Sequence, residues 1–126
     1  MSGSRNRNAG HGWERDSARG FRECSYPFVV TTRSESKSRD DKGIDLMNKD
    51  EYKNGLFEFS VQCKCTQKNP DYHSLIEELP KDFGIPIVFH RKTLKTKTRF
   101  RVVGEYATLR VEDFYNLLRK INGVTD

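Results

Sequence analysis

An aspartate, an amide and a lysine lie on two predicted strands at spacings that suit metal-dependent hydrolysis. Asp45 lies in the segment 43–46, and Gln62 and Lys64 lie in the segment 56–66. Because the side chains of a strand alternate between its faces, Gln62 and Lys64 point the same way. Oxygen ligands beside a lysine on a pair of strands are a common arrangement for cleaving a phosphodiester bond with a divalent metal. The sequence therefore predicts a hydrolytic site on these strands.

Phosphodiester cleavage needs a nucleophilic water and a group that stabilises charge on the leaving oxygen, and a divalent metal helps with both. In this interpretation Asp45 is the central ligand, and Oε1 of Gln62 and the backbone carbonyl of Cys63 add oxygen ligands. Glu14, from a predicted helix, contacts the metal directly or through a bound water. Such a set of oxygen ligands suits Mg²⁺ or Mn²⁺ rather than zinc. Lys64 orients the attacking water and offsets developing negative charge.

Other acidic residues are alternative ligands. Glu58 shares the face of Gln62, but at the rise of a strand it lies about 13 Å from Lys64. Asp40 and Asp41 lie in a polar segment, which is a poor place to fix a metal. Each proposed residue, taken alone, also has an ordinary explanation as a strand-end, solvent-facing or ion-paired side chain.

The three cysteines are predicted to be reduced and mostly buried thiols. Cys63 and Cys65 share one strand face, where a disulfide between them would be strained. A zinc site made by these two and His73 is an alternative, although it lacks the paired spacing of zinc sites.

Hydrophobic periodicity places these residues on an alternating series of helices and strands. The segment 33–42 contains no apolar side chain and is predicted to be a solvated loop. The predicted order of elements is helix 12–23, strands 28–32, 43–48 and 56–66, helix 71–79, strands 85–90 and 99–103, and helix 111–121. This order predicts an α/β fold with a mixed central β-sheet flanked by helices.

The chain of 126 residues is long enough for one domain. Residues 1–10 are rich in Gly, Ser, Asn and Arg, and they are predicted to form a flexible basic arm. Residues 11–126 are predicted to form a single nuclease domain.

The net charge of +5 suits a polyanionic partner. The basic residues gather in the arm and in the predicted loops, which favours contact with DNA phosphates. No apolar run approaches the roughly 20 residues of a membrane span. The N-terminus also lacks the apolar segment that a secretion signal would contain. We therefore expect a cytoplasmic protein with no membrane partner. The residues predicted to contact DNA are Arg5, Arg7, Arg15, Arg33, Ser34, Lys37, Arg39, Lys68, Arg91, Lys92, Lys95 and Lys97.

The order of these motifs resembles that of the PD-(D/E)XK nuclease superfamily and, more narrowly, that of the archaeal-type and phage-encoded Holliday-junction resolvases. The resemblance covers roughly residues 12–105 and includes the basic arm that precedes them. The matching segments are Trp13-Glu14-Arg15, the strand 28–32, the Ser-rich segment 33–38, Gly43-Ile44-Asp45, Gln62-Cys63-Lys64 and the segment 83–88. Two departures stand out. Gln62 replaces the family's carboxylate, so the metal should bind less tightly, and no proline precedes Asp45.

The resemblance implies a restriction-endonuclease-like fold and a Mg²⁺-dependent endonuclease that resolves four-way DNA junctions by paired nicks. It also implies a homodimer, because symmetric nicking needs two sites, and the host cytoplasm as its location if the chain is phage-encoded. Two alternatives stay open. One is a nonspecific or restriction-type endonuclease with the same site. The other is a catalytically inactive DNA-binding protein on a nuclease-like fold.

Overall fold

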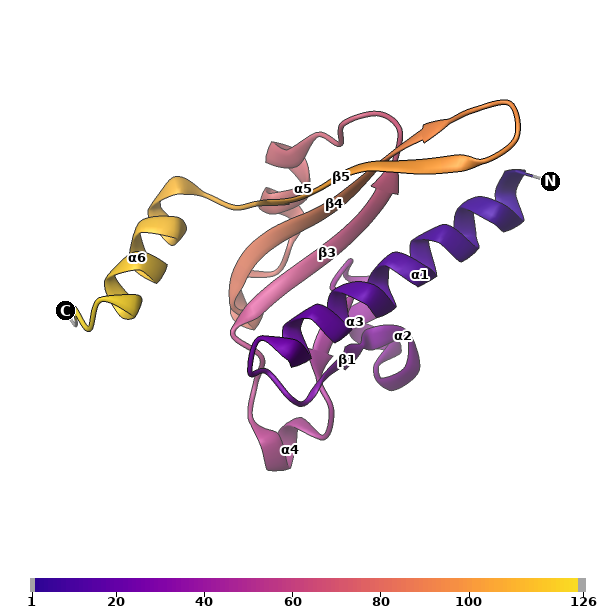
Figure 1. The fold of residues 1–126 in the computed structure, drawn as a ribbon. Helices are drawn as coiled ribbons and strands as arrows, with labels where there is room; N and C mark the ends of the chain where they lie inside the picture. Colours follow the sequence, from indigo (N-terminus) through magenta and orange to yellow (C-terminus); the bar gives the residue numbers. More distant parts are fainter. Residues whose placement is uncertain (1, 125–126) are drawn as a thin grey trace.

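The computed structural model describes the backbone of residues 2–124 and the side chains of residues 7–124. Figure 1 shows the elements in order. The helices are α1 (Ser2–Glu23), α2 (Thr32–Glu35), α3 (Lys37–Asp41), α4 (Glu51–Asn54), α5 (Tyr72–Glu78) and α6 (Val111–Ile121), with a 3₁₀ turn at Lys81–Phe83. The strands are β1 (Val29–Thr31), β2 (Leu46–Asn48), β3 (Phe59–Thr66), β4 (Ile85–Lys95) and β5 (Phe100–Thr108).

The larger sheet is mixed and has the strand order β3-β4-β5. β3 and β4 run parallel, and β5 returns antiparallel to β4 through a long hairpin. Trp13 of α1 packs against Phe89, whereas Tyr72 of α5 packs against the neighbouring His90. Because successive residues of a strand face opposite sides, α1 and α5 cover opposite faces of this sheet. The predicted α/β fold with a mixed sheet flanked by helices is confirmed at this level.

β1 and β2 form a separate antiparallel pair beside the larger sheet. This pair joins β3 where the backbone N–H of Asp45 donates to the carbonyl of Val61, at 2.8 Å. The two segments that carry the predicted site are therefore neighbours, as expected, although they belong to different sheets.

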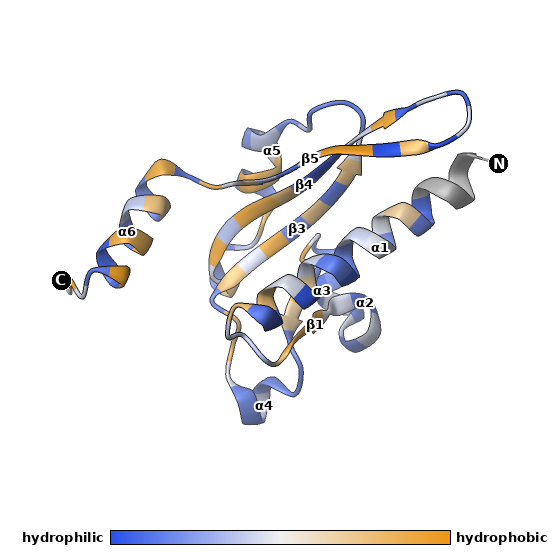
Figure 2. Ribbon diagram, in the orientation of Figure 1, coloured by the Kyte–Doolittle hydropathy of each residue, from blue (hydrophilic) through white to orange (hydrophobic). Residues whose placement is uncertain are grey.

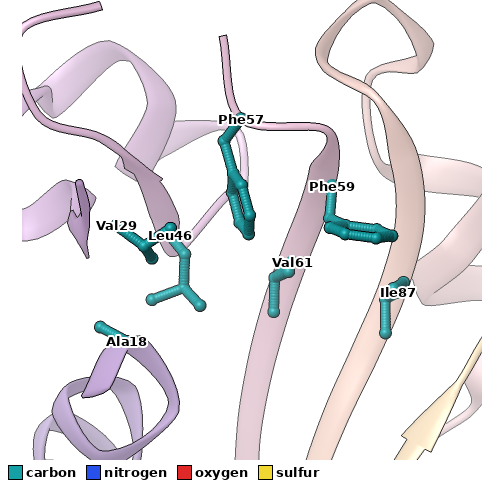
Figure 3. Packing of buried hydrophobic residues seen from close by; sticks show 7 residues of the cluster. All are labelled: Ala18, Val29, Leu46, Phe57, Phe59, Val61 and Ile87. Atoms are coloured by element: carbon teal, nitrogen blue, oxygen red, sulfur yellow. The ribbon is translucent and has the colours of Figure 1, made fainter. Parts of the chain in front are cut away.

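The core lies between α1, the β1–β2 pair and the α1-facing side of β3 and β4. Figure 3 shows its buried side chains, to which α1 contributes the small Ala18. Phe21 adds an aromatic cluster, with its ring 5.3 Å from that of Phe89 and 5.0 Å from that of Phe57. Figure 2 shows β3 and β4 with long hydrophobic stretches. The labelled members of the core are Ala18, Val29, Leu46, Phe57, Phe59, Val61 and Ile87.

Several segments differ from the sequence-based expectations. Strands β4 and β5 extend beyond the predicted strands 85–90 and 99–103, and two other segments are of a different type. Helix α1 begins at Ser2 and runs through residues for which the sequence predicts a flexible arm. Once residues 12–23 are helical, each further residue adds one hydrogen bond without a new nucleation cost. The segment 33–42 forms α2 and α3 rather than an irregular loop, because Ser36 caps α3 by accepting a hydrogen bond from the backbone N–H of Arg39.

The cysteines are free thiols, as predicted, but Cys24 is exposed rather than buried, and Cys63 and Cys65 are only partly buried. Cys24 follows the last helical residue of α1 and so lies outside the buried stripe. Within the described residues, no helix is long and apolar enough to cross a membrane.

Gly84, at the start of β4, is a position where we expect a large loss of stability on substitution. Its φ is +103°, and a Cβ there would lie 2.2 Å from the backbone oxygen of Glu58. Gly84→Ala should lower the free energy of unfolding by more than about 2 kcal/mol, because both the left-handed backbone and the backbone clash are unfavourable. Urea denaturation measures this loss. Gly123→Ala is the control, since Gly123 also has a positive φ but no atom within 4 Å of the added Cβ. Equal losses in the two variants would contradict the packing argument.

Candidate active site

Two neighbouring segments of the chain hold Asp45 in place. Its carbonyl accepts a hydrogen bond from the N–H of Thr32 at 2.9 Å. Its carboxylate oxygen Oδ2 accepts a hydrogen bond from the N–H of Cys63 on β3 at 2.7 Å. The fully buried Thr32 also donates its hydroxyl to the carbonyl of Ile44 at 2.6 Å. The backbone of this segment is therefore held by Thr32, and the carboxylate is held by the N–H of Cys63.

Gly43 brings the chain close to Gln62. Its φ is +82°, and a Cβ at this position would lie 3.0 Å from Nε2 of Gln62. A glycine two residues before Asp45 therefore has a physical reason, because it allows the left-handed turn and leaves room for the amide. Gln62 also borders a cleft of about 220 Å³ with Gly43 and with Leu79 of the α5 region.

Glu14 enters the site from α1. Its side chain is 7% exposed, so this is a buried carboxylate. Both of its oxygens accept from Nη2 of Arg33 in α2, at 3.0 and 3.2 Å. The side chain of Arg33 is 44% exposed, so the positive partner of this buried carboxylate is itself in contact with solvent.

Burial raises the pKa of Asp45 from 3.8 to about 7. This pKa already includes the hydrogen bond from Cys63 and the positive charge of Lys64, which lower it, and the negative charges of Glu14 and Asp40, which raise it. The charges of Glu14 and Lys64 therefore both act on the carboxylate of Asp45. A buried carboxylate beside a second one is a site where a bound cation is favourable.

Lys64 lies on the α5 side of β3, next to His90 of β4 in the parallel register. It borders a cleft of about 330 Å³ together with Lys68 of the following loop and Glu78 of α5. Glu78 also borders the cleft next to Gln62. Gln62 and Lys64 therefore face the same region under α5, as the strand alternation predicts.

A buried histidine supports this region from the next strand. The ring nitrogens of His90 lie 2.9 Å from Oγ1 of Thr66 and 3.1 Å from the hydroxyl of Tyr72. Burial lowers the pKa of His90, so the ring is neutral at neutral pH. This polar cluster ties α5 to the sheet beside Lys64. The sequence analysis missed it, because nothing in the spacing of the three residues indicates that they meet.

The donor set suits a hard cation better than zinc. Glu14 and Asp45 offer carboxylates, and Gln62 offers an amide oxygen. The N–H and C=O of one residue point to the same side of a strand, so the Cys63 carbonyl faces the edge at which its N–H binds Asp45. Burial raises the pKa of the Cys63 thiol, and the charge of Asp45 raises it further, which keeps this sulfur protonated. The residues present therefore fit Mg²⁺ or Mn²⁺.

The alternative ligands are not assembled in the same way. Among the described residues, no three His, Cys, Asp or Glu side chains form a metal-binding group, so Cys63, Cys65 and His73 do not make a zinc site. Glu58 lies beside Tyr26, whose pKa burial and the Glu58 carboxylate raise. Asp40 acts on Asp45 electrostatically from α3.

Several residues predicted to contact DNA make contacts within the protein. Arg91 lies on the α1 side of the sheet, 4.4 Å above the ring of Trp13 and in ion pairs with Asp16 and Glu105. Arg39 stacks on Phe83 and pairs with Glu51. The residues in this group are Arg39, Arg91, Arg33 (bound to Glu14) and Lys92 (bound to Asn69).

The remaining predicted DNA contacts lie on the surface or beyond the described side chains. The side chain of Arg5 falls outside the described part of the chain. Lys68 lies at the rim of the cleft that also contains Lys64. The exposed members are Arg7, Arg15, Ser34, Lys37, Lys68, Lys95 and Lys97.

Comparisons with known proteins do not identify this site. No family model, no curated protein and no solved structure matches the chain. The function therefore has to be argued from the site itself.

Proposed function

We propose that this protein is a metal-dependent endonuclease of the restriction-endonuclease-like type that nicks branched DNA, in particular four-way junctions, as a homodimer. The observation that supports the proposal is the buried carboxylate of Asp45 beside β3, on which the charges of both Glu14 and Lys64 act, with Gly43 bringing its segment close to the amide of Gln62. These groups come from α1, the segment before β2, and β3. The arrangement supplies oxygen ligands and a cation next to each other, as phosphodiester hydrolysis requires.

Asp45, Glu14, Gln62 Oε1 and the Cys63 carbonyl would hold Mg²⁺ or Mn²⁺, which supplies an acidic bound water and neutralises charge at the leaving oxygen. Lys64 offers an ammonium group that orients the water and stabilises negative charge on the phosphate. Arg33 balances the charge of Glu14 and presents its exposed part to the DNA backbone.

The surface around the site supports a DNA substrate. Arg15, Lys37 and Lys68 are exposed, and Lys68 shares a cleft with Lys64. These cations suit backbone phosphates, which carry no sequence information. A selectivity for DNA shape rather than for base sequence follows from such contacts.

A second candidate function is DNA binding without cleavage. Gln62 is the observation that favours it, because an amide brings no charge to the metal. The site then binds cations too weakly for turnover, while the exposed basic residues still bind DNA.

The test is to incubate the protein with a labelled four-way junction and with a linear duplex of the same arms, in Mg²⁺ and in Mn²⁺. We expect paired nicks near the branch point for the wild type and no product for Asp45→Asn. Equal cutting of both substrates would leave a nuclease but reject the junction selectivity. Binding of the junction without cutting in either metal would reject the nuclease in favour of the DNA-binding alternative.

A further inference from the structure

The hairpin between β4 and β5 carries basic side chains that its own protein does not neutralise. Residues 91–104 contain six basic residues and no acidic one. Arg91 and Lys92, at the base of the hairpin, are held by partners within the protein. The other four lie near the turn and are exposed, and within the described residues none of them forms an ion pair. These four exposed cations are Lys95, Lys97, Arg99 and Arg101.

The turn at the end of the hairpin is closed by its own hydrogen bonds. The backbone N–H of Thr96 donates to the carbonyl of Arg99 at 2.8 Å, and the N–H of Arg99 donates to Oγ1 of Thr96 at 3.2 Å. The hydroxyl of Thr96 also donates to that carbonyl, at 2.8 Å. The four cations therefore project from a defined ribbon of two strands rather than from an irregular loop. Such preorganisation lowers the entropy that is lost when a partner binds.

The hairpin extends the side of the sheet that carries Gln62 and Lys64. Lys64 lies beside His90 in the parallel register, and Leu94 lies four residues further along β4, so strand alternation puts Leu94 on the same side. Leu94 pairs with Arg101 across the hairpin. Figure 1 shows the turn projecting beyond the end of β3. At the rise of a strand, the turn lies about 20 Å from the level of Lys64.

The chemistry of the turn fits a polyphosphate better than a lipid surface. The segment 95–99 consists of lysine, threonine and arginine and contains no apolar side chain. These three residue types are donors that bind the backbone phosphates of DNA. A segment that lies in a membrane interface instead carries large apolar side chains opposite its cations. The turn therefore favours a nucleic acid as its partner.

The shape of the hairpin fits one groove of duplex DNA. The major groove is about 12 Å wide and admits a two-stranded β-ribbon, whereas the minor groove is only about 6 Å wide. Base pairs follow one another at about 3.4 Å, so the distance of about 20 Å between Lys64 and the turn corresponds to about six base pairs. A duplex with one phosphate at Lys64 therefore reaches the hairpin within the same helical turn.

We propose that the β4–β5 hairpin enters the major groove of a duplex arm about six base pairs from the phosphate held at Lys64. The four exposed cations then contact the phosphates that border this groove. The distance from Lys64 rests on the proposed function, whereas the binding of a duplex by the hairpin needs no cleavage. In this position the hairpin sets how much continuous duplex the protein requires beside its site.

The first test measures binding to a four-way junction with arms of roughly 20 base pairs, about two helical turns, at several salt concentrations and without divalent metal. Replacing the four exposed cations by glutamine should weaken binding at least about 100-fold at about 0.1 M salt. The slope of log Kd against log salt should fall by about three to four, because each phosphate contact contributes about 0.9. This hairpin variant combines Lys95→Gln, Lys97→Gln, Arg99→Gln and Arg101→Gln.

The matched control removes four exposed cations from the α4 region and from α6, so it has the same net charge as the hairpin variant. It combines Lys49→Gln, Lys53→Gln, Arg119→Gln and Lys120→Gln. Equal losses in the two variants, or wild-type binding by the hairpin variant, would overturn the proposal. So would a hairpin variant that loses binding to phosphatidylserine vesicles but keeps its affinity for DNA. Circular dichroism verifies that both variants are folded.

The second test identifies the groove with dimethyl sulfate, which methylates N7 of guanine in the major groove and N3 of adenine in the minor groove. The wild type should protect guanine N7 about four to eight base pairs from its nick or, where it does not nick, from the branch point. The hairpin variant should not. Protection of adenine N3 alone at this distance, or no protection in the arms, would overturn the proposal.

These results separate the hairpin from the proposed nuclease activity. If the wild type binds through the hairpin but cuts in neither Mg²⁺ nor Mn²⁺, this inference stands and only the nuclease is rejected. If the hairpin variant binds and nicks like the wild type, only this inference is rejected. A wild type that does not bind DNA at all would reject both.

Discussion

Asp45→Asn is expected to raise the free energy of unfolding of the metal-free protein by about 2–4 kcal/mol at pH 8, although it removes the central residue of the proposed active site. The reason is the pKa of Asp45, which burial raises to about 7. A pKa that is raised by one corresponds to a free-energy difference of about 1.4 kcal/mol between the protonated and the charged form. Asparagine keeps an oxygen that can accept the hydrogen bond from Cys63 but carries no buried charge.

The pH dependence of this gain follows from proton binding. Between pH 3.8 and about 7 the folded protein keeps a proton on Asp45 that the unfolded chain has lost. The stability of the wild type therefore falls as the pH rises through this window, and the loss is complete above the folded pKa. The gain from Asp45→Asn should be largest at pH 8 and should nearly vanish at about pH 4. Urea denaturation at a series of pH values measures both.

A metal ion should make the wild type more stable than Asp45→Asn, the reverse of the order expected without metal. Mg²⁺ or Mn²⁺ binds the folded wild type and stabilises it by mass action. The variant lacks the ligand charge, so its Tm should not respond. Asp41→Asn is the matched control, because Asp41 is exposed at the end of α3 and should leave both the pH profile and the metal response unchanged. A loss of stability in Asp45→Asn at pH 8, or equal metal responses in the three proteins, would contradict the assignment of Asp45 to a metal site.

Lys64→Gln is expected to lower the rate of nicking at saturating DNA by about 10²–10³-fold, the usual effect of removing one group that stabilises transition-state charge. The substitution keeps a polar side chain that can hydrogen-bond, although it is one bond shorter, and it removes the positive charge. Because Lys64 is not a metal ligand in this proposal, the Tm of Lys64→Gln should still rise with Mg²⁺ or Mn²⁺. Single-turnover cleavage of a labelled junction measures the rate.

Lys68→Gln is the control for Lys64, since both lysines border the same cleft. A lysine that contacts only backbone phosphate should weaken DNA binding and reduce the salt dependence of log Kd by about one. Its cleavage rate at saturating DNA should stay close to that of the wild type. Similar rates in Lys64→Gln and the wild type would show that Lys64 binds DNA or solvent rather than acting in the reaction.

The regular elements and the backbone of the site follow from local patterns in the sequence. The predicted helix 111–121 coincides with α6, and Asp71 caps α5 by accepting from the backbone N–H of Ser74, as expected. The alternation along β3 puts Gln62 and Lys64 on the α5 side, and Gly43 brings the segment of Asp45 close to Gln62. These features depend on backbone dihedral angles, on side-chain alternation and on near neighbours in the chain.

Charge partners and the unpaired helix face depend on packing between distant segments. The sequence alone does not show that Arg33 binds Glu14, that Arg91 packs on Trp13, or that His90 meets Tyr72, because each contact joins separate elements across the fold. The raised pKa of Asp45 likewise depends on its burial and on the nearby charge of Glu14, which the sequence alone does not show. The amphipathic pattern of α6 determines that it has an apolar face, but only the tertiary structure decides that this face is not used by its own core. The physical reason is that local propensity acts over a few residues, whereas burial and ion pairing are decided when the whole chain packs.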